Sequence, residues 1–296
     1  MSEDHKVGFI GLGKMGSGIA ANLLKAGYKV RGCDLDEQAV HGFVDKGGIA
    51  VSSIRELISS CDIIATCLLG RVSVPLADRE LIPNAEPGKV FVEHSTIPVP
   101  ESKRIGKAYR EKGAEYLDAA ISGGTTGAAS GTLRLFIGGD RETAERCRPL
   151  FEAAGNPEKI VYCGEVGSGQ AAKVVQQMTH RFPDLARLEV LAFGVHSGLE
   201  TETIMRALDV SPDSADSYVQ LIEGLSKGDL ESRSYEFAEW EFFLAQAQSA
   251  GFRMPMLEAM YEHCKNGTKK TSDGAGRAEP SVWHELMHPP KKSSNQ

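Results

Sequence analysis

The stretch from Gly167 to Gln177 (GSGQAAKVVQQ) gathers side chains whose types and spacing could serve chemistry. Its glycines and serine precede helix-forming residues, which predicts that a helix begins here. Lys173 lies in that helix, and Gln176, Gln177 and His180 follow at three, four and seven residues, so all four share a face. A lysine amine can move a proton if it is partly desolvated. Taken alone, however, this polar stripe is more typical of a solvated helix face, and the upstream motifs must decide.

A G-x-G-x-x-G motif near the start indicates a dinucleotide site. It follows a short apolar strand at 6–10 and opens a helix, and a second strand at 28–34 comes next, which is the context that gives the motif its meaning. The first glycine permits a tight turn, the second lets the backbone approach a pyrophosphate, and the third lets the helix pack close to the strand. The diphosphate would rest on the free N–H groups of the helix. The expected cofactor contacts in this loop are Gly11, Leu12, Gly13, Lys14, Met15 and Gly16.

Asp34 ends the second predicted strand and indicates which dinucleotide is bound. A carboxylate there accepts hydrogen bonds from the adenosine ribose hydroxyls and repels a 2′-phosphate. Leu35 follows, where an NADP enzyme would carry a cation. The alternative is that Asp34 only starts a turn. The pattern favours NAD over NADP.

Further cofactor contacts are expected where later strands end, because ligands of open α/β sheets bind beyond the carboxyl ends of the strands. The apolar run 62–69 and the segment 89–93 both predict strands. Leu68, Leu69 and Thr96 lie at such ends and are candidates to touch the cofactor. His94 lies there too, although an imidazole at a strand end is more often structural.

A second glycine-rich element, Ile121 to Gly131, follows a predicted strand at 115–119 and reads as a loop. It has no lysine in the P-loop position, so it does not predict a nucleoside triphosphate site. Ser122, Gly123 and Gly124 offer a hydroxyl and unhindered N–H groups that could hold a small anion such as a carboxylate. A flexible connection would explain the glycines equally well.

The organisation of the chain changes near Gly167. Strand and helix patterns alternate before it, and after it helical periodicity dominates without a convincing strand. The sequence therefore predicts an α/β Rossmann-type N-terminal domain over 1–165 and an all-α C-terminal domain over 166–296, loosely ordered from about 268. Pro183 lies inside the first long helical pattern and predicts a kink or break there, at a cost of ~3 kcal/mol.

Composition excludes several function classes. The 296 residues carry a formal net charge of -7, which argues against a nucleic-acid partner. No stretch is long and apolar enough to span a membrane, and we see no export or organelle signal. The six cysteines are scattered without C-x-x-C pairs, which favours a reducing cytoplasm and predicts neither a disulfide framework nor a metal site.

The order of these motifs resembles the β-hydroxyacid dehydrogenase family of the 6-phosphogluconate dehydrogenase superfamily, which includes 3-hydroxyisobutyrate dehydrogenase and tartronate semialdehyde reductase. The resemblance runs from Val7 to about Pro255. It rests on VGFIGLGKMGSGIAANLLKAGY, STIP, LDAAISGGTTGAASGTL and GEVGSGQAAKVVQQ, in that order.

The resemblance implies an enzyme that transfers a hydride between NAD and a small 3-hydroxy acid or its semialdehyde. It implies that the Ser122–Gly124 turn holds the substrate carboxylate and that Lys173 is the catalytic acid/base. Gln176 and Gln177 would take the place of a substrate-orienting asparagine. A homo-oligomer, dimer or tetramer, is expected from the apolar helices of the second half.

Three departures from the family pattern leave alternatives open. Glutamine replaces asparagine after the lysine, Ala238 and Glu239 stand where relatives carry a Lys-Asp pair, and His180 and Pro183 replace apolar residues. One alternative is an imine-reductase-like enzyme, although those sites generally lack the lysine. The other is an NAD(P)-binding scaffold protein without turnover.

Overall fold

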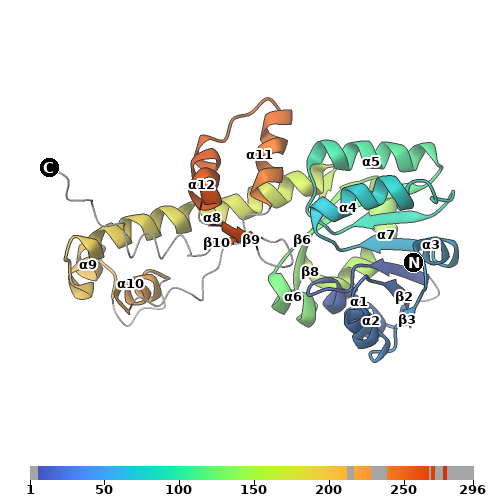
Figure 1. Cartoon of the computed structure of the whole chain (residues 1–296), viewed down its shortest axis with the longest axis horizontal. Helices are drawn as coiled ribbons and strands as arrows, with labels where there is room; N and C mark the ends of the chain where they lie inside the picture. Colours follow the sequence, from blue (N-terminus) through green and yellow to red (C-terminus); the bar gives the residue numbers. More distant parts are fainter. Residues whose placement is uncertain (1–5, 212–216, 228–238, 267, 271–275, 279–296) are drawn as a thin grey trace. The chain divides into compact units, whose positions relative to one another are not determined.

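The computed structural model describes residues 6–211, 217–227, 239–266, 268–270 and 276–278 (Figure 1). The chain divides into two compact units, Met1–Val175 and Gln176–Gln296. The division falls inside the long helix α8 (Ser168–His196), whereas the expected domain boundary at 165/166 lies just before that helix. The two units are described separately.

The first unit alternates strands and helices. Its strands are β1 (Lys6–Ile10), β2 (Lys29–Cys33), β3 (Ile49–Ala50), β4 (Ile63–Thr66), β5 (Val90–Glu93), β6 (Glu115–Ser122), β7 (Leu133–Gly139) and β8 (Gly155–Gly164). Its helices are α1 (Gly16–Lys25), α2 (Glu37–Val44), α3 (Ile54–Ser60), α4 (Gly70–Leu76), the π-helical η1 (Ala77–Leu81), α5 (Val99–Glu111), α6 (Gly124–Ser130), α7 (Arg141–Ala154) and the start of α8.

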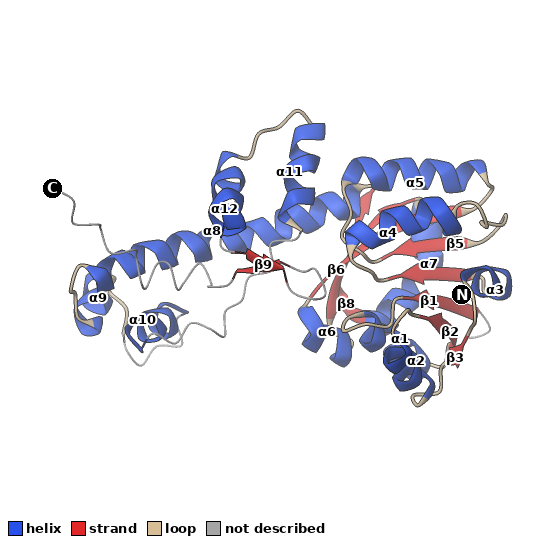
Figure 2. Cartoon of the chain, in the orientation of Figure 1, coloured by secondary structure: helices blue, strands red, loops and turns tan. Residues whose placement is uncertain are grey.

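These strands form one sheet in the order β3-β2-β1-β4-β5-β6-β7-β8 (Figure 2). The pairs from β3 to β6 are parallel, β7 runs antiparallel to β6, and β8 is parallel to β7. The order 3-2-1-4-5-6 is that of the Rossmann fold, whose direction of winding reverses between β1 and β4. The predicted fold class is therefore confirmed for this unit.

Both faces of the central strands are buried, as the continuous apolar runs predict. Alternation along β5 sends Val90 and Val92 into one core cluster and Phe91 into another. Side chains of α1 and α7 join the first cluster, and those of α3, η1 and α5 join the second. Helices thus cover both faces of the sheet, which leaves the strand ends as the place for a ligand.

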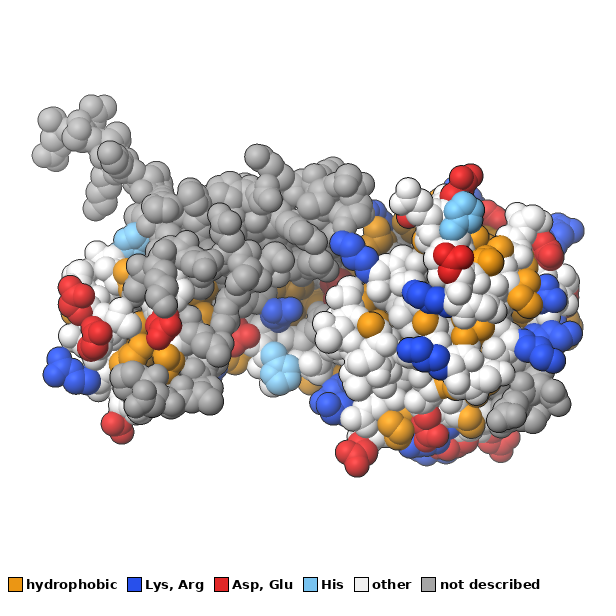
Figure 3. Space-filling model, turned by 90° about the horizontal axis from the view of Figure 1, so that it is seen from below, with side chains coloured by type: hydrophobic (Ala, Val, Ile, Leu, Met, Phe, Trp, Pro, Cys, Tyr) orange, Lys and Arg blue, Asp and Glu red, His pale blue; other side chains and the backbone are white. Residues whose placement is uncertain are grey.

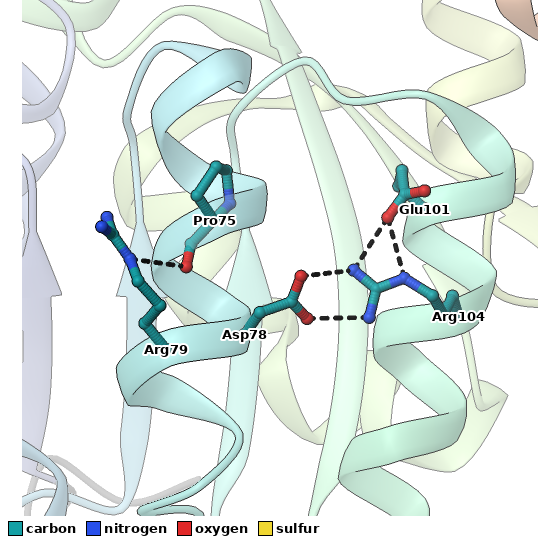
Figure 4. Close-up of polar contacts among 5 residues, drawn as sticks. All are labelled: Pro75, Asp78, Arg79, Glu101 and Arg104. Atoms are coloured by element: carbon teal, nitrogen blue, oxygen red, sulfur yellow. Dashed lines mark hydrogen bonds and ion pairs between the residues drawn. The ribbon is translucent and has the colours of Figure 1, made fainter.

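An ion pair ties η1 to α5 on the surface of this unit (Figure 4). The guanidinium of Arg104 donates to both carboxylate oxygens of Asp78, at 2.8 and 2.9 Å, and its Nε donates to Glu101 at 2.8 Å. The Arg104 and Asp78 side chains are each 45% exposed, so solvent screening limits the pair to about 0–1 kcal/mol. It links the two helices at the surface, while their shared apolar cluster accounts for most of their packing.

Charges of both signs are interspersed on the face of the first unit that Figure 3 presents. Lysine and arginine side chains lie there together with aspartate and glutamate, and apolar side chains lie between them. That face therefore carries no field of a single sign.

The second glycine-rich element corrects one prediction. The sequence reads as a loop from Ile121 to Gly131, but the residues from Gly124 to Ser130 form α6. Packing explains the helix, because a Cβ at Gly18 of α1 would lie 2.7 Å from the Ala128 backbone. The Asn22 amide also donates to the Ala128 carbonyl at 2.8 Å. Tertiary contact with α1 overrides the weak helix propensity of this segment.

The second unit is helical, as predicted, and contains one small sheet. It holds the remainder of α8, then α9 (Thr201–Ala207), α10 (Ser217–Lys227), α11 (Trp240–Ser249), α12 (Pro255–Asn266), β9 (Thr268–Lys270) and β10 (Gly276–Ala278). The antiparallel pair of β9 and β10 contradicts the expectation of no strand after Gly167. The rest of the predicted loose tail lies outside the described residues.

Of the kink or break predicted at Pro183, the break is wrong, since α8 continues through this residue to His196. A proline removes one hydrogen bond from the helix and does not by itself end it. Leu188, Leu191 and Ala192, just beyond it, are buried. Their burial stabilises the second part of α8 despite the lost bond. No described helix of the chain is long and apolar enough to cross a membrane.

Candidate active site

The glycine-rich loop joins β1 to α1, and its three glycines meet different surroundings. Gly11 has φ +94°, and a Cβ there would lie 2.4 Å from the carbonyl oxygen of Cys67. A Cβ at Gly16 would lie 1.9 Å from the Gly11 carbonyl oxygen, so helix and turn touch backbone to backbone. A Cβ at Gly13 would meet nothing within 4 Å. The loop is thus closed at its two ends and open at Gly13, where a ligand could approach the backbone.

The N-terminus of α1 has the character of an anion site. Met15 caps the helix without a side-chain hydrogen bond, and no acidic residue lies in the first turn. The first N–H groups of the helix and its positive dipole end are therefore not occupied by a side chain. Such an end suits a diphosphate. Lys14 is exposed and lines an open groove of about 700 Å³ with Ser17, Lys25 and Lys46.

Asp34 holds the glycine-rich loop in place. Its Oδ2 accepts the N–H of Leu12 at 2.5 Å, and its Oδ1 accepts the N–H of Asp36 at 2.9 Å. The bond to Asp36 agrees with the turn alternative, and the bond to Leu12 is a further role that the sequence did not predict. A carboxylate has about four acceptor positions, so capacity for ribose hydroxyls remains. Leu35 beside it is 99% exposed and brings no cation.

The loops after β4 and β5 meet at the switch point of the sheet. The N–H of Leu68 donates to the Ser95 hydroxyl at 2.8 Å, and the Leu68 side chain lies against Gly11. Leu69 is the N-cap of α4 and is 42% exposed, and Thr96 is half-buried. The structure thus brings Leu68 to the glycine-rich loop.

Glu93 is a buried residue of this region that sequence reasoning missed. Glu93 is 4% exposed. Its carboxylate accepts a hydrogen bond from the Ser73 hydroxyl and another, at 2.8 Å, from the N–H of Ser95. Burial raises the pKa of Glu93, and these hydrogen bonds act against the increase. A glutamate that ends an otherwise apolar strand was the available signal, because an acid so placed needs partners.

The contacts of His94 favour the structural interpretation. The ring is 2% exposed, stacks on Phe9 at 6.4 Å between centroids, and pairs through Nδ1 with the Ala119 carbonyl at 2.8 Å. Nε2 has no hydrogen-bond partner among the described residues. Burial lowers the pKa of His94 to about 4. The ring is therefore neutral at physiological pH.

The Ser122–Gly124 turn lies between β6 and α6 and is open to solvent. Gly123 has φ 140° and Gly124 has φ 61°, conformations that favour glycine, and both residues are exposed. A Cβ at Gly124 would meet nothing within 4 Å. The hydroxyl of half-buried Ser122 and the backbone of this turn are therefore accessible to a small anion.

Lys173 lies beside this turn. Its side chain is 5% exposed, and its Nζ donates to the carbonyl oxygen of Ile121 at 2.6 Å. Ile121 immediately precedes Ser122, so the candidate acid/base and the candidate carboxylate receptor meet within the first unit. This juxtaposition removes the reading of Lys173 as part of a solvated stripe.

The other members of the stripe differ from Lys173. Within the second unit, Nε2 of Gln177 donates to Oε2 of Glu239 at 2.9 Å. Oε1 of Gln176 is buried and has no hydrogen-bond partner among the described residues. His180 is exposed, which is the solvated-face reading for that residue. Ala238 lies outside the described residues.

Asp118, also missed from the sequence, anchors the start of α8. Its side chain is 0% exposed, with Oδ1 accepting the N–H of Gly167 at 2.7 Å and Oδ2 accepting that of Gln170 at 2.9 Å. Burial raises the pKa of Asp118, and these N–H groups favour its charged form. A carboxylate at a helix N-terminus stabilises the first turn. In the described part of the chain, no group of three or more His, Cys, Asp or Glu residues could hold a metal ion.

Comparison with known proteins identifies the family of this chain. Residues 6–164 match the family model described as the NAD binding domain of 6-phosphogluconate dehydrogenase. The NAD-dependent L-serine dehydrogenase of Pseudomonas aeruginosa is 41% identical over 202 residues, which is 67% of each chain. The chain belongs to the β-hydroxyacid dehydrogenase family. The resemblance of its motifs to that family is confirmed.

Two further members of the β-hydroxyacid dehydrogenase family extend the match over most of the chain. The mitochondrial 3-hydroxyisobutyrate dehydrogenase of Mus musculus is 30% identical over 288 residues, covering 91% of this chain and 85% of that one. The solved structure of Mycobacterium tuberculosis 3-hydroxyisobutyrate dehydrogenase with L-serine has a TM-score of 0.80 at 26% identity. It covers 95% of this chain and 99% of the other. The first unit is thus a nicotinamide-dinucleotide-binding domain, and the open Gly13 and uncapped α1 fit that group.

Proposed function

We propose that this protein is an NAD-dependent dehydrogenase of small 3-hydroxy acids, or of the corresponding semialdehydes in the reverse direction. Lys173 is the general acid/base. The observation that carries the proposal is the 2.6 Å hydrogen bond from Lys173 Nζ to the Ile121 carbonyl, which places the amine beside the Ser122–Gly124 turn. A proton-transfer group and an anion receptor then face one small substrate together.

Oxidation of an alcohol removes a hydride and a proton. When bound, NAD supplies the hydride acceptor at nicotinamide C4. The neutral amine of Lys173 takes the hydroxyl proton and becomes an ammonium, and in the reverse direction that ammonium returns the proton to the developing alkoxide. The hydrogen bond to Ile121 holds the amine beside the Ser122–Gly124 turn, where the substrate hydroxyl would lie. General catalysis of this kind contributes typically about 10²- to 10⁴-fold.

The Ser122–Gly124 turn fixes which carbon faces the nicotinamide. The Ser122 hydroxyl and the glycine N–H groups bind the carboxylate, and the hydroxyl-bearing carbon then falls toward Lys173. Holding two reacting groups in place in this way is a large part of enzymatic rate enhancement. The L-serine named with two of the relatives is itself a small 3-hydroxy acid, which supports this substrate class.

Of the two glutamines on α8, Gln176 is the better candidate to orient the substrate. Its buried Oε1 has no partner among the described residues, whereas the amide of Gln177 is engaged by Glu239. Gln176 follows Lys173 by three residues, so both project from one side of the helix. Gln176 would accept a hydrogen bond from a substrate hydroxyl or amino group.

The preference for NAD rests on Asp34 and Leu35. The Asp34 carboxylate would repel a 2′-phosphate, and the exposed Leu35 offers it no cation. We also propose a cytoplasmic homo-oligomer. The free cysteines Cys33, Cys61, Cys67, Cys147 and Cys163 support the compartment. Exposed Val190 and Phe193 on α8 support self-association.

The experiment that tests the function assays the purified chain with NAD or NADP against a panel of small 3-hydroxy acids, and compares Lys173→Ala. We expect turnover of at least one acid with NAD, and loss of about 10²- to 10⁴-fold in kcat in the variant with NAD binding retained. Full activity of Lys173→Ala would overturn the assignment of the lysine. Turnover of cyclic imines alone would favour the imine-reductase-like alternative, and calorimetric NAD binding without any turnover would favour the scaffold.

A further inference from the structure

Gln170 connects two parts of the site that the sequence treats as separate. Its side chain is 1% exposed, and both ends of its amide are used. Nε2 donates to the carbonyl oxygen of Ser95 at 2.8 Å, and Oε1 accepts the N–H of Ile97 at 3.2 Å. These two backbone groups flank Thr96, so one carboxamide spans the whole turn after β5.

The same residue belongs to the first turns of α8. Its backbone N–H donates to Asp118 at 2.9 Å, and Lys173 follows three residues later on the same face of the helix. A Cβ at Gly169 would lie 2.4 Å from the Phe136 carbonyl, so the helix is packed directly against β7 here. A shift of Gln170 would therefore be transmitted to Lys173 through a short, rigid piece of helix.

We propose that Gln170 is a positioning residue for Lys173, holding the first turns of α8 against the Thr96 turn so that the lysine Nζ stays at the Ile121 carbonyl. The proposal rests on the acid/base role of Lys173. Gln170 does not touch the reacting atoms; it acts through the lysine that follows it. Proton transfer depends on the position of the Lys173 Nζ, because a displacement of about 1 Å in the reacting geometry can cost about 100-fold in rate.

Replacement by methionine isolates the hydrogen bonds from the packing. Gln170→Met keeps an unbranched side chain of similar length and removes both the donor to Ser95 and the acceptor for Ile97. Gln170→Glu keeps the size and the acceptor for Ile97 but loses the donor.

The test is a double-mutant cycle on the rate of hydride transfer. Single-turnover NADH formation is measured, at saturating NAD and hydroxy acid, in wild type, Gln170→Met, Lys173→Ala and the double variant. We expect Gln170→Met to slow the step by about 10- to 100-fold when Lys173 is present. In the Lys173→Ala background the same change should alter the rate by less than about 3-fold, because no amine remains to be positioned.

Two further readouts separate positioning from general damage. The Kd for NAD in Gln170→Met should stay within about 3-fold of wild type, since the step lost is chemical rather than binding. Gln248→Met, at an exposed glutamine of α11, is the matched control and should leave rate and Tm unchanged. If Gln170→Met does not fold, the same cycle is run with Gln170→Glu.

Equal slowing in both backgrounds, no slowing in the presence of Lys173, or a loss confined to NAD binding would each overturn the proposal. Failure of the acid/base assignment is recognised separately, since Lys173→Ala alone would then retain the wild-type rate. The slowing caused by Gln170→Met with Lys173 present, divided by the slowing in Lys173→Ala, tests the positioning role of Gln170. The rate of Lys173→Ala alone tests the acid/base role of the lysine.

Discussion

The Nζ of Lys173 donates to the main-chain carbonyl of Ile121 at 2.6 Å, joining α8 to the end of β6. The two residues are 52 positions apart in sequence. Nothing local in either segment indicates the contact, yet it brings the candidate acid/base to the residue before the candidate carboxylate receptor. The predictions below follow from this arrangement and from the buried groups that support it.

Ser122→Ala should weaken substrate binding without affecting NAD. The lost hydrogen bond is to a charged carboxylate, which is worth about 1.5–3 kcal/mol, so KM for the hydroxy acid should rise about 10- to 100-fold. Steady-state kinetics with each substrate varied separately measures this. Ser130→Ala, at the other end of α6, is the matched control. An unchanged KM for the acid would show that the carboxylate binds elsewhere.

Asp34→Asn combined with Leu35→Arg should shift the cofactor preference toward NADP. The change removes the charge that repels a 2′-phosphate and adds a cation beside it, while the asparagine oxygen can still accept the N–H of Leu12. We expect the ratio of kcat/KM for NADP to that for NAD to rise by more than about 10-fold. Leu35→Arg alone should raise this ratio by less than the double variant does. No shift in the double variant would mean that the ribose lies away from Asp34.

Much of the first unit could be predicted because its signals are local. A strand, three spaced glycines and an amphipathic helix identify the loop at Gly11–Gly16, and Asp34 ends the next strand. The helix α6 could not be predicted, since its glycines and serine disfavour a helix until Ala128 packs on Gly18.

The supporting residues of the site were missed for a similar reason. Gln170 bonds to residues 73 and 75 positions away, and Asp118 to residues 49 and 52 positions away. A glutamine within a helical pattern or an aspartate within a strand pattern has no local mark of such partners. Only the fold brings them to the start of α8.

His94 should make the protein less stable in acid. Its pKa is lowered to about 4 by burial, so between its ordinary value of 6.5 and 4 the unfolded chain binds the proton and the folded chain does not. The contribution of His94 to stability is therefore fully present above pH 6.5 and is lost as pH falls toward 4, by roughly 3 kcal/mol at most. His94→Phe should remove this loss while forfeiting about 1 kcal/mol of hydrogen bonding to Ala119.

Urea unfolding of wild type and His94→Phe between pH 7.5 and 4.5 measures the effect. The exposed His41 provides the matched control, His41→Phe, which should keep the wild-type profile. If His94→Phe and wild type lose stability in parallel over this range, the buried imidazole is not the cause of the acid sensitivity.

Glu93 should make the protein less stable as pH rises, the opposite of the effect of His94. Burial raises its pKa, so the folded protein holds a proton that the unfolded chain has already released. The associated stability is full in acid and is lost as pH rises through the raised value. Glu93→Gln keeps the size of the side chain and an oxygen for the N–H of Ser95, and cannot ionise. The free energy of unfolding of Glu93→Gln should therefore rise relative to that of wild type as pH increases from about 4.5 to 8.

Urea unfolding over this range measures the difference, with exposed Glu158→Gln as the control. A constant difference between Glu93→Gln and wild type at every pH would show that Glu93 stays ionised in the folded protein.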